Sequence, residues 1–295
     1  MKKLLGIALA SAAAGLCLSA LKKASDEQTV ELSPIKRSSP NKKAILVVSF
    51  GTSYAQTREK TIGAIEEDFR SAFPEYTIRR AFTSKMIIKK LRERDGIEVD
   101  TVAQALEKLE AEGYSTVICQ PTHVMGGFEF DDVKREVENW KGRFDHIACG
   151  WPLLTSSEDY EQVTEALVQE FSDIPSDAAL VLMGHGTEHP ANATYPALDY
   201  RLKARGCKNF FVGTVEGYPD LQTVMQEVAA IHASKVFLAP LMVVAGDHAI
   251  NDLCGEEEDS WNSCFEQAGY QTEPILKGLG EYPAFRRIYL EHCVQ

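Results

Sequence analysis

Two histidines and one glutamate occupy corresponding points of three successive segments in the C-terminal half of the sequence. His185 follows one apolar run, Glu216 follows the next, and His248 lies in the loop after a third. The intervals of 31 and 32 residues each match the length of one strand–helix unit. Because neighbouring parallel strands end at the same edge of a sheet, we expect the three side chains to meet there. Two imidazoles and a carboxylate are a suitable ligand set for a divalent first-row metal such as Co, Fe, Ni or Zn.

Each of these residues also has an ordinary structural interpretation. A histidine beside a glycine at a strand end often makes only local hydrogen bonds, and His185 precedes Gly186. His248 would be the first residue of a helix if Asp247 were its N-cap, and Glu216 would be a turn carboxylate. The occurrence of all three at strand ends favours a functional site over three separate structural roles.

Other candidate groups carry weaker signals. His123 follows a strand-like run and is open to three interpretations: a cleft residue, a ligand of a haem-like iron, or a residue with a core or capping role. Residues 185–189 (HGTEH) are not the HExxH motif of zinc proteases, because the glutamate is at the wrong position and Gly186 would break the helix. His189 is therefore interpreted as a cleft residue and not as a metal ligand. The sequence has no Walker loop, GxGxxG or GxSxG motif, which argues against a phosphate cradle or a serine nucleophile elbow.

The elements that must position these residues alternate along the chain from residue 44 onward. Short β-branched runs are separated by amphipathic helical patterns, and this alternation is typical of α/β folds in which helices cover parallel sheets. We expect strands at 44–49, 76–82, 116–120, 146–149, 179–183, 209–213, 235–239 and 272–276. The clearest expected helices span 57–73, 99–112, 131–140, 157–171, 221–233 and 283–291.

The two halves of this region share three similar stretches in the same order. The first pair is ILVVSFGTS and LVLMGHGTE, the second RAFTSKM and FVGTVEG, and the third CQPTHVMGGFEFDD and APLMVVAGDHAIND. Such internal repetition predicts two similar lobes, each a parallel sheet flanked by helices, covering residues 44–150 and 151–295. Ligands of open α/β sheets bind beyond the carboxyl ends of the strands, so we expect the site between the lobes.

The same repeat identifies the residues that would face the metal site from the first lobe. The counterparts of the three candidate ligands are Phe50, Lys85 and Glu129. Only Glu129 among them could add an acidic group across the cleft, so the metal site itself is expected in the second lobe.

Charge and composition limit the partners and suggest a compartment. The 295 residues carry a formal charge of -12 with 44% hydrophobic residues, which excludes bulk disorder and disfavours nucleic acid as a partner. Lys2 and Lys3 precede an alanine-rich apolar run, so residues 1–20 are predicted to be a secretory signal peptide and residues 21–43 a flexible linker. We therefore expect a periplasmic protein, with an uncleaved membrane anchor as the alternative. An oxidising compartment would permit disulfides among the six cysteines after the signal.

Together these motifs resemble the class II tetrapyrrole chelatases, most closely the anaerobic sirohydrochlorin cobaltochelatases of the CbiK type, in an exported form. The resemblance covers nearly all of residues 44–295. It is carried by ILVVSFGTS, QPTHVMGGFEFDDV, MGHGTEH, GTVEGYP and APLMVVAGDHAINDL, of which the last is the most specific. The resemblance implies two similar α/β lobes with a tetrapyrrole cleft between them.

The resemblance also implies a reaction and a role for each candidate residue. A chelatase of this type would insert Co²⁺, with Fe²⁺ as a second candidate ion, into a tetrapyrrole while two pyrrole protons are removed. His185 would be both base and metal ligand, and His248 and Glu216 would be further metal ligands. Glu129 would be a catalytic proton acceptor or a group that orients the substrate. Imidazole suits these tasks because its pKa of about 6.5 lets it bind an ion or accept a proton near neutral pH.

Binding of the macrocycle and the alternative function stay open at this level. An acidic protein needs local cations to hold a macrocycle that bears carboxylates, and the candidates are Lys85, Lys89, Lys90, Arg79 and Arg80. An exported, non-catalytic carrier of metal, tetrapyrrole or haem is the alternative function, because two α/β lobes around a cleft also describe periplasmic binding proteins. The sequence is compatible with a homo-oligomer.

Overall fold

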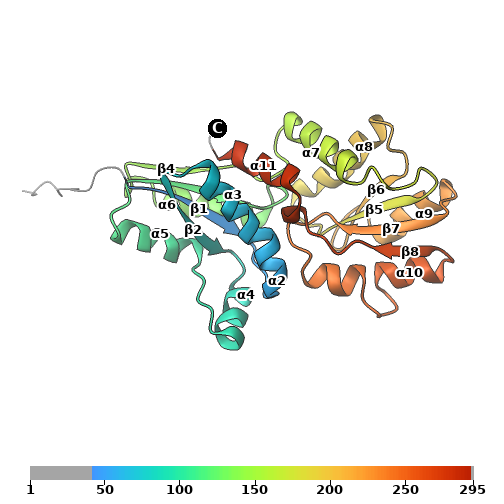
Figure 1. Ribbon diagram of the computed structural model, residues 1–295, viewed down its shortest axis with the longest axis horizontal. Coiled ribbons are helices and arrows are strands. Elements are labelled where there is room, and N and C mark those ends of the chain that lie inside the picture. Colours follow the sequence, from blue (N-terminus) through green and yellow to red (C-terminus); the bar gives the residue numbers. More distant parts are fainter. Residues whose placement is uncertain (1–41, 294–295) are drawn as a thin grey trace, which may run out of the picture. The chain divides into compact units, whose positions relative to one another are not determined.

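The first of two sheets is built from the N-terminal half of the described chain. The structure is a computed structural model that describes residues 42–293, so the predicted signal peptide and nearly all of the predicted linker lie outside the described residues. All four strands of this sheet are parallel, in the order β2-β1-β3-β4 (Figure 1). They are β1 (Lys43–Ser49), β2 (Tyr76–Phe82), β3 (Thr116–Pro121) and β4 (His146–Cys149).

The central strand of this sheet is buried on both faces, which explains its continuous apolar sequence. Ile45 and Val47 pack in one hydrophobic cluster with α3 (Ala64–Ala72). Leu46 and Val48 point to the other face, where they pack with α5 (Val102–Ala111) and α6 (Phe128–Asn139). Alternate side chains of β1 therefore hold helices on both faces of the sheet.

The second sheet repeats the arrangement of the first. Its strands are also parallel and follow the order β6-β5-β7-β8, so the same crossover pattern occurs twice. They are β5 (Ala179–Gly184), β6 (Phe210–Thr214), β7 (Lys235–Pro240) and β8 (Gln271–Pro274). The predicted fold class is confirmed: two similar parallel sheets flanked by helices. The division into domains at 44–150 and 151–295 stays a prediction.

The repeated Gly-Thr dipeptide marks a tight exit from the central strand of each sheet. Gly51 after β1 has a φ of 100°, and Gly186 after β5 has a φ of 83°, both in the left-handed region that favours glycine. A Cβ atom on Gly51 would lie 2.5 Å from the ring of Phe82, and one on Gly186 would lie 2.7 Å from the backbone of Glu216. Neither position has room for a side chain. Gly51 lets the turn after β1 pack against the Phe82 ring of β2, and Gly186 lets the turn after β5 approach the loop after β6.

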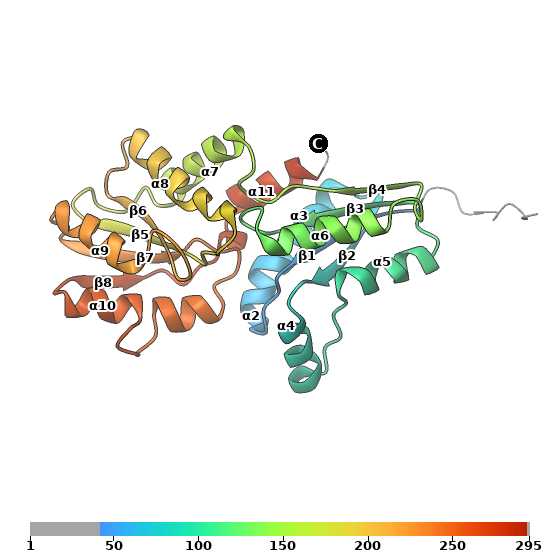
Figure 2. The ribbon, with the colours of Figure 1, turned by 180° about the vertical axis from the view of Figure 1, so that it is seen from behind.

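Helices connect the strands and lie on both faces of the sheets (Figure 2). All of the clearest expected helices are present, with ends shifted by up to three residues. The helical elements α4, α8 and α10 were not among them. The remaining elements are α2 (Ala55–Arg58), η1 (Glu59–Gly63), α4 (Lys85–Lys90), η2 (Leu91–Asp95), α7 (Ser157–Glu170), η3 (Pro190–Ala193), α8 (Thr194–Ala204), α9 (Leu221–Ala230), η4 (Ala249–Leu253), α10 (Trp261–Gln267), η5 (Leu279–Glu281) and α11 (Pro283–His292).

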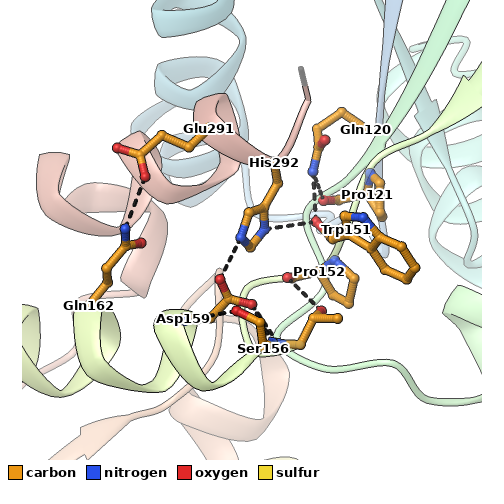
Figure 3. Close-up of polar contacts among 10 residues, drawn as sticks. Gln120, Pro121, Trp151, Pro152, Ser156, Asp159, Gln162, Glu291 and His292 are labelled. Atoms are coloured by element: carbon orange, nitrogen blue, oxygen red, sulfur yellow. Dashed lines mark hydrogen bonds and ion pairs between the residues drawn. The ribbon is translucent and has the colours of Figure 1, made fainter. Parts of the chain in front are cut away.

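The last helix, α11, ties the two halves of the described chain together. It packs against both α3 and α7, and Arg286 Nε donates to Asp68 Oδ2 on α3 at 2.6 Å (Figures 1 and 2). At the other end of α11, His292 Nε2 lies 2.9 Å from Asp159 Oδ1 on α7, and both side chains are buried. Its Nδ1 lies 3.3 Å from the Trp151 carbonyl, so α11 fixes the segment that connects the two sheets (Figure 3).

Two further observations concern the membrane and the cysteines. Within residues 42–293, no helix is both long enough and apolar enough to cross a membrane.

The six cysteines in this range are all free thiols, and no disulfide joins any two of them. Cys119 in β3 is fully buried, as is common for a free cysteine that acts as a small apolar core residue.

Candidate active site

The loops that follow β1, β3, β5 and β7 line one cavity of about 640 Å³. This is the edge of the sheets at which ligands of α/β proteins bind, and the volume is within the range of small-molecule sites. Phe50, Met86 and Phe128 supply exposed apolar side chains to its lining. Within the described part of the chain, the predicted catalytic and metal-binding residues from both halves all line this cavity.

The two histidines predicted to share a metal ion lie side by side. The ring centroids of His185 and His248 are 4.5 Å apart, and the ring planes are nearly perpendicular at 87°. His185 Nδ1 is 2.9 Å from the carbonyl oxygen of Gly186. Because a carbonyl oxygen only accepts hydrogen bonds, Nδ1 must carry the proton, which leaves the lone pair of His185 on Nε2.

The second imidazole is oriented by a carboxylate. His248 Nδ1 lies 2.7 Å from Asp252 Oδ2, four residues later on the same helical segment. The carboxylate accepts the Nδ1 proton, so the lone pair of His248 is also on Nε2. Metal-binding histidines commonly have such a carboxylate partner, which fixes the ring and raises its basicity as a ligand. Asp252 was not predicted from the sequence, although its spacing of four residues from His248 on a helix is a usable signal.

Glu216 lies beside this pair but does not complete a compact ligand set. Its Oε2 atom is 3.8 Å from His185 Nδ1, the nitrogen already bonded to Gly186, and its side chain is 60% exposed. The position follows from the backbone, because the Glu216 amide donates to the His185 carbonyl at 2.8 Å. In residues 42–293, no group of three or more His, Cys, Asp or Glu side chains is arranged to hold a metal ion. A metal site formed by His185, Glu216 and His248 together therefore stays a prediction.

Glu129, the predicted proton acceptor, begins α6 and contributes to the same cavity. Thr83 Oγ1 donates to its Oε2 atom at 2.5 Å, and His123 Nε2 lies 3.3 Å from the same oxygen. Burial raises the pKa of Glu129, but the hydrogen bonds that its carboxylate accepts from His123 and Thr83 outweigh this effect. The net result is a pKa below the usual value, so Glu129 is ionised at neutral pH.

One hydrogen bond and one histidine–carboxylate pair join the two halves of the described chain beside the cavity. Tyr54 donates to Asp247 Oδ1 at 2.6 Å, a bond that raises the pKa of Tyr54. Asp247 itself lies in the first turn of the helix that contains His248, because that helix begins after Gly246, so the interpretation of Asp247 as its N-cap is wrong. His189 accepts from the Ala191 amide through Nδ1, so its Nε2 carries the proton toward Asp131 at 3.3 Å.

The predicted cations fall into two groups. Arg79 pairs with Glu112 and Arg80 with Glu66, so both arginines are engaged by the body of the first half. The expectation that Arg79 and Arg80 bind the macrocycle is not supported. Successive side chains of β2 point to opposite faces of the sheet, and each arginine forms an ion pair on its own face. Lys90 instead lies 5.9 Å from the ring centre of Tyr54, a residue that lines the cavity. Lys85 and Lys89 are exposed on the same helix, next to Met86.

A family model described as cobalt chelatase (CbiK) matches residues 43–295. This chain belongs to the CbiK cobalt chelatase family. The sirohydrochlorin cobaltochelatase of Salmonella typhimurium is 45% identical to it over 254 residues, which cover 86% of this chain and 96% of that protein. The sirohydrochlorin cobaltochelatase CbiKC of Nitratidesulfovibrio vulgaris is 34% identical over 264 residues, covering 88% of this chain and 93% of that protein.

Solved structures agree with the CbiK assignment at the level of the fold. SirB from Bacillus subtilis with Fe³⁺ has a TM-score of 0.57 at 15% identity, covering 85% of this chain and 94% of that one. CbiX, described as the terminal enzyme for biosynthesis of sirohaem in denitrifying bacteria, has a TM-score of 0.50 at 14% identity, covering 85% and 97%. The resemblance to class II chelatases inferred from the motifs is therefore confirmed, and the protein is a metal chelatase of the CbiK family.

Proposed function

We propose that this protein is a sirohydrochlorin cobaltochelatase, which inserts Co²⁺ into the macrocycle while two pyrrole protons are removed. One observation carries the proposal: the rings of His185 and His248 lie 4.5 Å apart, each with its lone pair on Nε2, and both line a cavity that also contains the ionised Glu129. The names of the two curated relatives support sirohydrochlorin as the macrocycle and cobalt as the ion.

The paired imidazoles would hold the substrate metal before insertion. Both Nε2 atoms would donate to one Co²⁺ ion, and Glu216 would contribute an exposed carboxylate beside His185. A closed tetrahedral shell would retain the ion, whereas two imidazoles and one carboxylate leave positions open for the pyrrole nitrogens. The acidic character of the protein, with a net charge of -12, favours encounter with a cation.

The protons would leave on two different groups. As the first metal–nitrogen bond forms, one pyrrole N–H bond breaks and its proton moves to Glu129, while the electron pair stays on the pyrrole nitrogen. Transfer of the ion to the ring frees the Nε2 lone pair of His185, which can then accept the second proton. The metal enters as a dication and two protons leave, so the charge of the macrocycle is unchanged.

The apolar residues and the lysines of the rim fit the two parts of this substrate. Phe50, Met86 and Phe128 offer a surface for the flat ring. Lys90 and Lys85 on α4 are available for the carboxylate side chains, because no hydrogen bond or ion pair within the described residues engages their ammonium groups. We expect no nucleic acid partner, and the oligomeric state is a matter for measurement.

Localisation is a separate part of the proposal. The basic start and apolar run of residues 1–20 support export to the periplasm. Cell fractionation of the full chain and of a form that lacks residues 2–20 tests this directly. The full chain should be found in the periplasmic fraction and the shortened form in the cytoplasm. Recovery of both forms in the cytoplasm would overturn the proposal of export.

The insertion reaction is tested with a spectrophotometric assay of the purified protein. Co²⁺, Fe²⁺ and Ni²⁺ are each offered with sirohydrochlorin or protoporphyrin, and the absorption change on metal insertion is followed. His185→Ala should abolish insertion while binding of the macrocycle persists, whereas His146→Ala, at an exposed histidine of β4, serves as the matched control. Equal rates in the wild type and His185→Ala would favour a non-catalytic carrier instead.

A further inference from the structure

Glu129 receives two hydrogen bonds on one oxygen and none on the other. Thr83 Oγ1 and His123 Nε2 both contact Oε2, at 2.5 and 3.3 Å. Within the described part of the chain, no hydrogen bond reaches Oε1, and the side chain is 40% exposed. The two oxygens of one carboxylate are therefore differentiated: Oε2 is anchored, and Oε1 is available to a reacting group in the cavity.

The proton on His123 can be assigned from its surroundings. The Nδ1 atom of His123 is buried and has no hydrogen-bond partner among residues 42–293. An N–H group in that position would be buried without an acceptor, which is costlier than a bare lone pair. His123 is therefore neutral, with its proton on Nε2 directed at Glu129. His123 is therefore a fixed hydrogen-bond donor to Glu129, and its interpretation as a ligand of a haem-like iron stays a prediction.

The backbone around both donors is firmly held. The buried Tyr289 of α11 donates to the Thr122 carbonyl at 3.0 Å, and the Leu153 amide donates to the His123 carbonyl at 2.9 Å. The Thr83 amide donates to the Ser49 carbonyl at the end of β1, also at 2.9 Å. The two donors thus come from different strand ends and converge on a single atom of α6. This convergence is the arrangement expected for positioning a catalytic carboxylate.

We propose that His123 and Thr83 are positioning residues that hold Glu129 as an anion, with Oε1 free to accept the pyrrole proton. This inference rests on the proposed function, because it explains how one base of that reaction is kept ready inside a largely apolar cavity. The other titratable group that faces Glu129 is His185, across the cavity. Asp131, two residues further along α6, is already paired with Lys134 and His189.

The inference is tested with three variants and two measurements. His123→Leu removes the donor, His123→Gln retains an amide N–H near the position of Nε2 without an ionisable ring, and Thr83→Val removes only the hydroxyl. The first measurement is the pH dependence of kcat/KM, whose acid limb reports ionisation of the free enzyme. The second is a carboxyl ¹³C NMR titration of labelled glutamate, with Glu129→Gln used to assign the resonance.

His123→Leu should raise the pKa of Glu129 by about one unit and move the acid limb to higher pH by the same amount. Thr83→Val should shift both in the same direction, and His123→Gln should restore values close to the wild type. If His123→Leu does not fold, Thr83→Val and His123→Gln decide the question. Unchanged titrations in His123→Leu and Thr83→Val would overturn the inference, as would a His123→Gln variant as impaired as His123→Leu.

The NMR titration separates this inference from the proposed function. A wild-type protein that inserts no metal into any macrocycle would refute the proposed reaction. The titration of Glu129 in the wild type and variants would still show whether His123 and Thr83 keep it ionised. Conversely, an active wild type whose Glu129 titrates identically in all variants would leave the reaction standing and remove the positioning role.

Discussion

The carboxylate of Asp252 is expected to set the affinity of the metal site through His248. Asp252→Ala removes the acceptor that lies 2.7 Å from His248 Nδ1, so the ring can rotate and its Nε2 lone pair becomes less basic. Loss of such a partner commonly costs about 10–100-fold in metal affinity. Because the Asp252 side chain is 43% exposed, water can replace it in part, and we expect a loss of about tenfold, near 1.4 kcal/mol.

The assay for this variant is a titration with Co²⁺ in the absence of macrocycle, followed by visible absorption or calorimetry. Asp252→Asn retains a neutral hydrogen-bond acceptor, so its Co²⁺ affinity should fall by about threefold, which lies between the wild type and the alanine variant. The pair contributes little to folding, since exposed pairs four residues apart on a helix are worth about 0.5 kcal/mol. Glu93→Ala, on η2, breaks an exposed pair of the same spacing with Lys89 of α4 and serves as the control. Wild-type Co²⁺ affinity in Asp252→Ala would refute the reasoning.

Three further predictions concern the connection between the halves, the tight turn and the rim. Asp159→Asn should lower the free energy of unfolding by about 3 kcal/mol in urea, because it leaves the buried His292 without its charged partner. Burial raises the pKa of Asp159, but the hydrogen bonds from Ser156, His292 and Thr155 lower it by more than burial raises it. The pKa of Asp159 in the folded protein is therefore below its usual value. Its stabilisation is therefore present at neutral pH and lost as the pH falls through that native pKa, and Asp159→Asn should lack this acid dependence. Gly186→Ala should lower the free energy of unfolding by at least about 2 kcal/mol and impair metal insertion. Gly96→Ala, at a φ of 65° with open space around it, should lower it by about 1 kcal/mol. Equal losses in the two variants would show that the close approach of Gly186 to the Glu216 backbone is unimportant. Lys90→Glu should raise KM for sirohydrochlorin roughly two- to fivefold at low salt with kcat unchanged, and a neutral ester of the macrocycle should show no such change.

The fold could be predicted because its signals are local or repeat along the chain. The β-branched runs gave strands close to their observed ends, and the repeated Gly-Thr dipeptide reflects a steric requirement at Gly51 and Gly186. The matching order of the three stretches corresponds to two sheets with the same crossover pattern. The proximity of His185 and His248 followed from that topology, since both come after neighbouring parallel strands.

What escaped prediction depends on partners that are distant in the sequence. Asp247 accepts from Tyr54, 193 residues away, and no local pattern distinguishes this bond from a helix cap. Thr83 was visible only as a point of alignment between the halves, yet it contacts Glu129 from another strand. Glu216 lies beside Nδ1 of His185, and whether that nitrogen carries the proton or the lone pair depends on the tautomer of the ring. The contact of Nδ1 with the Gly186 carbonyl assigns the tautomer, and this contact is visible only in the structure.

The most direct test of a shared metal site is X-ray absorption spectroscopy of the protein with one equivalent of Co²⁺. We predict scattering from two imidazoles in the wild type, and from one imidazole in either His185→Ala or His248→Ala, with reduced affinity in both. A wild-type spectrum without two imidazole ligands, or one that neither substitution changes, would contradict the central claim that these two rings hold the ion together.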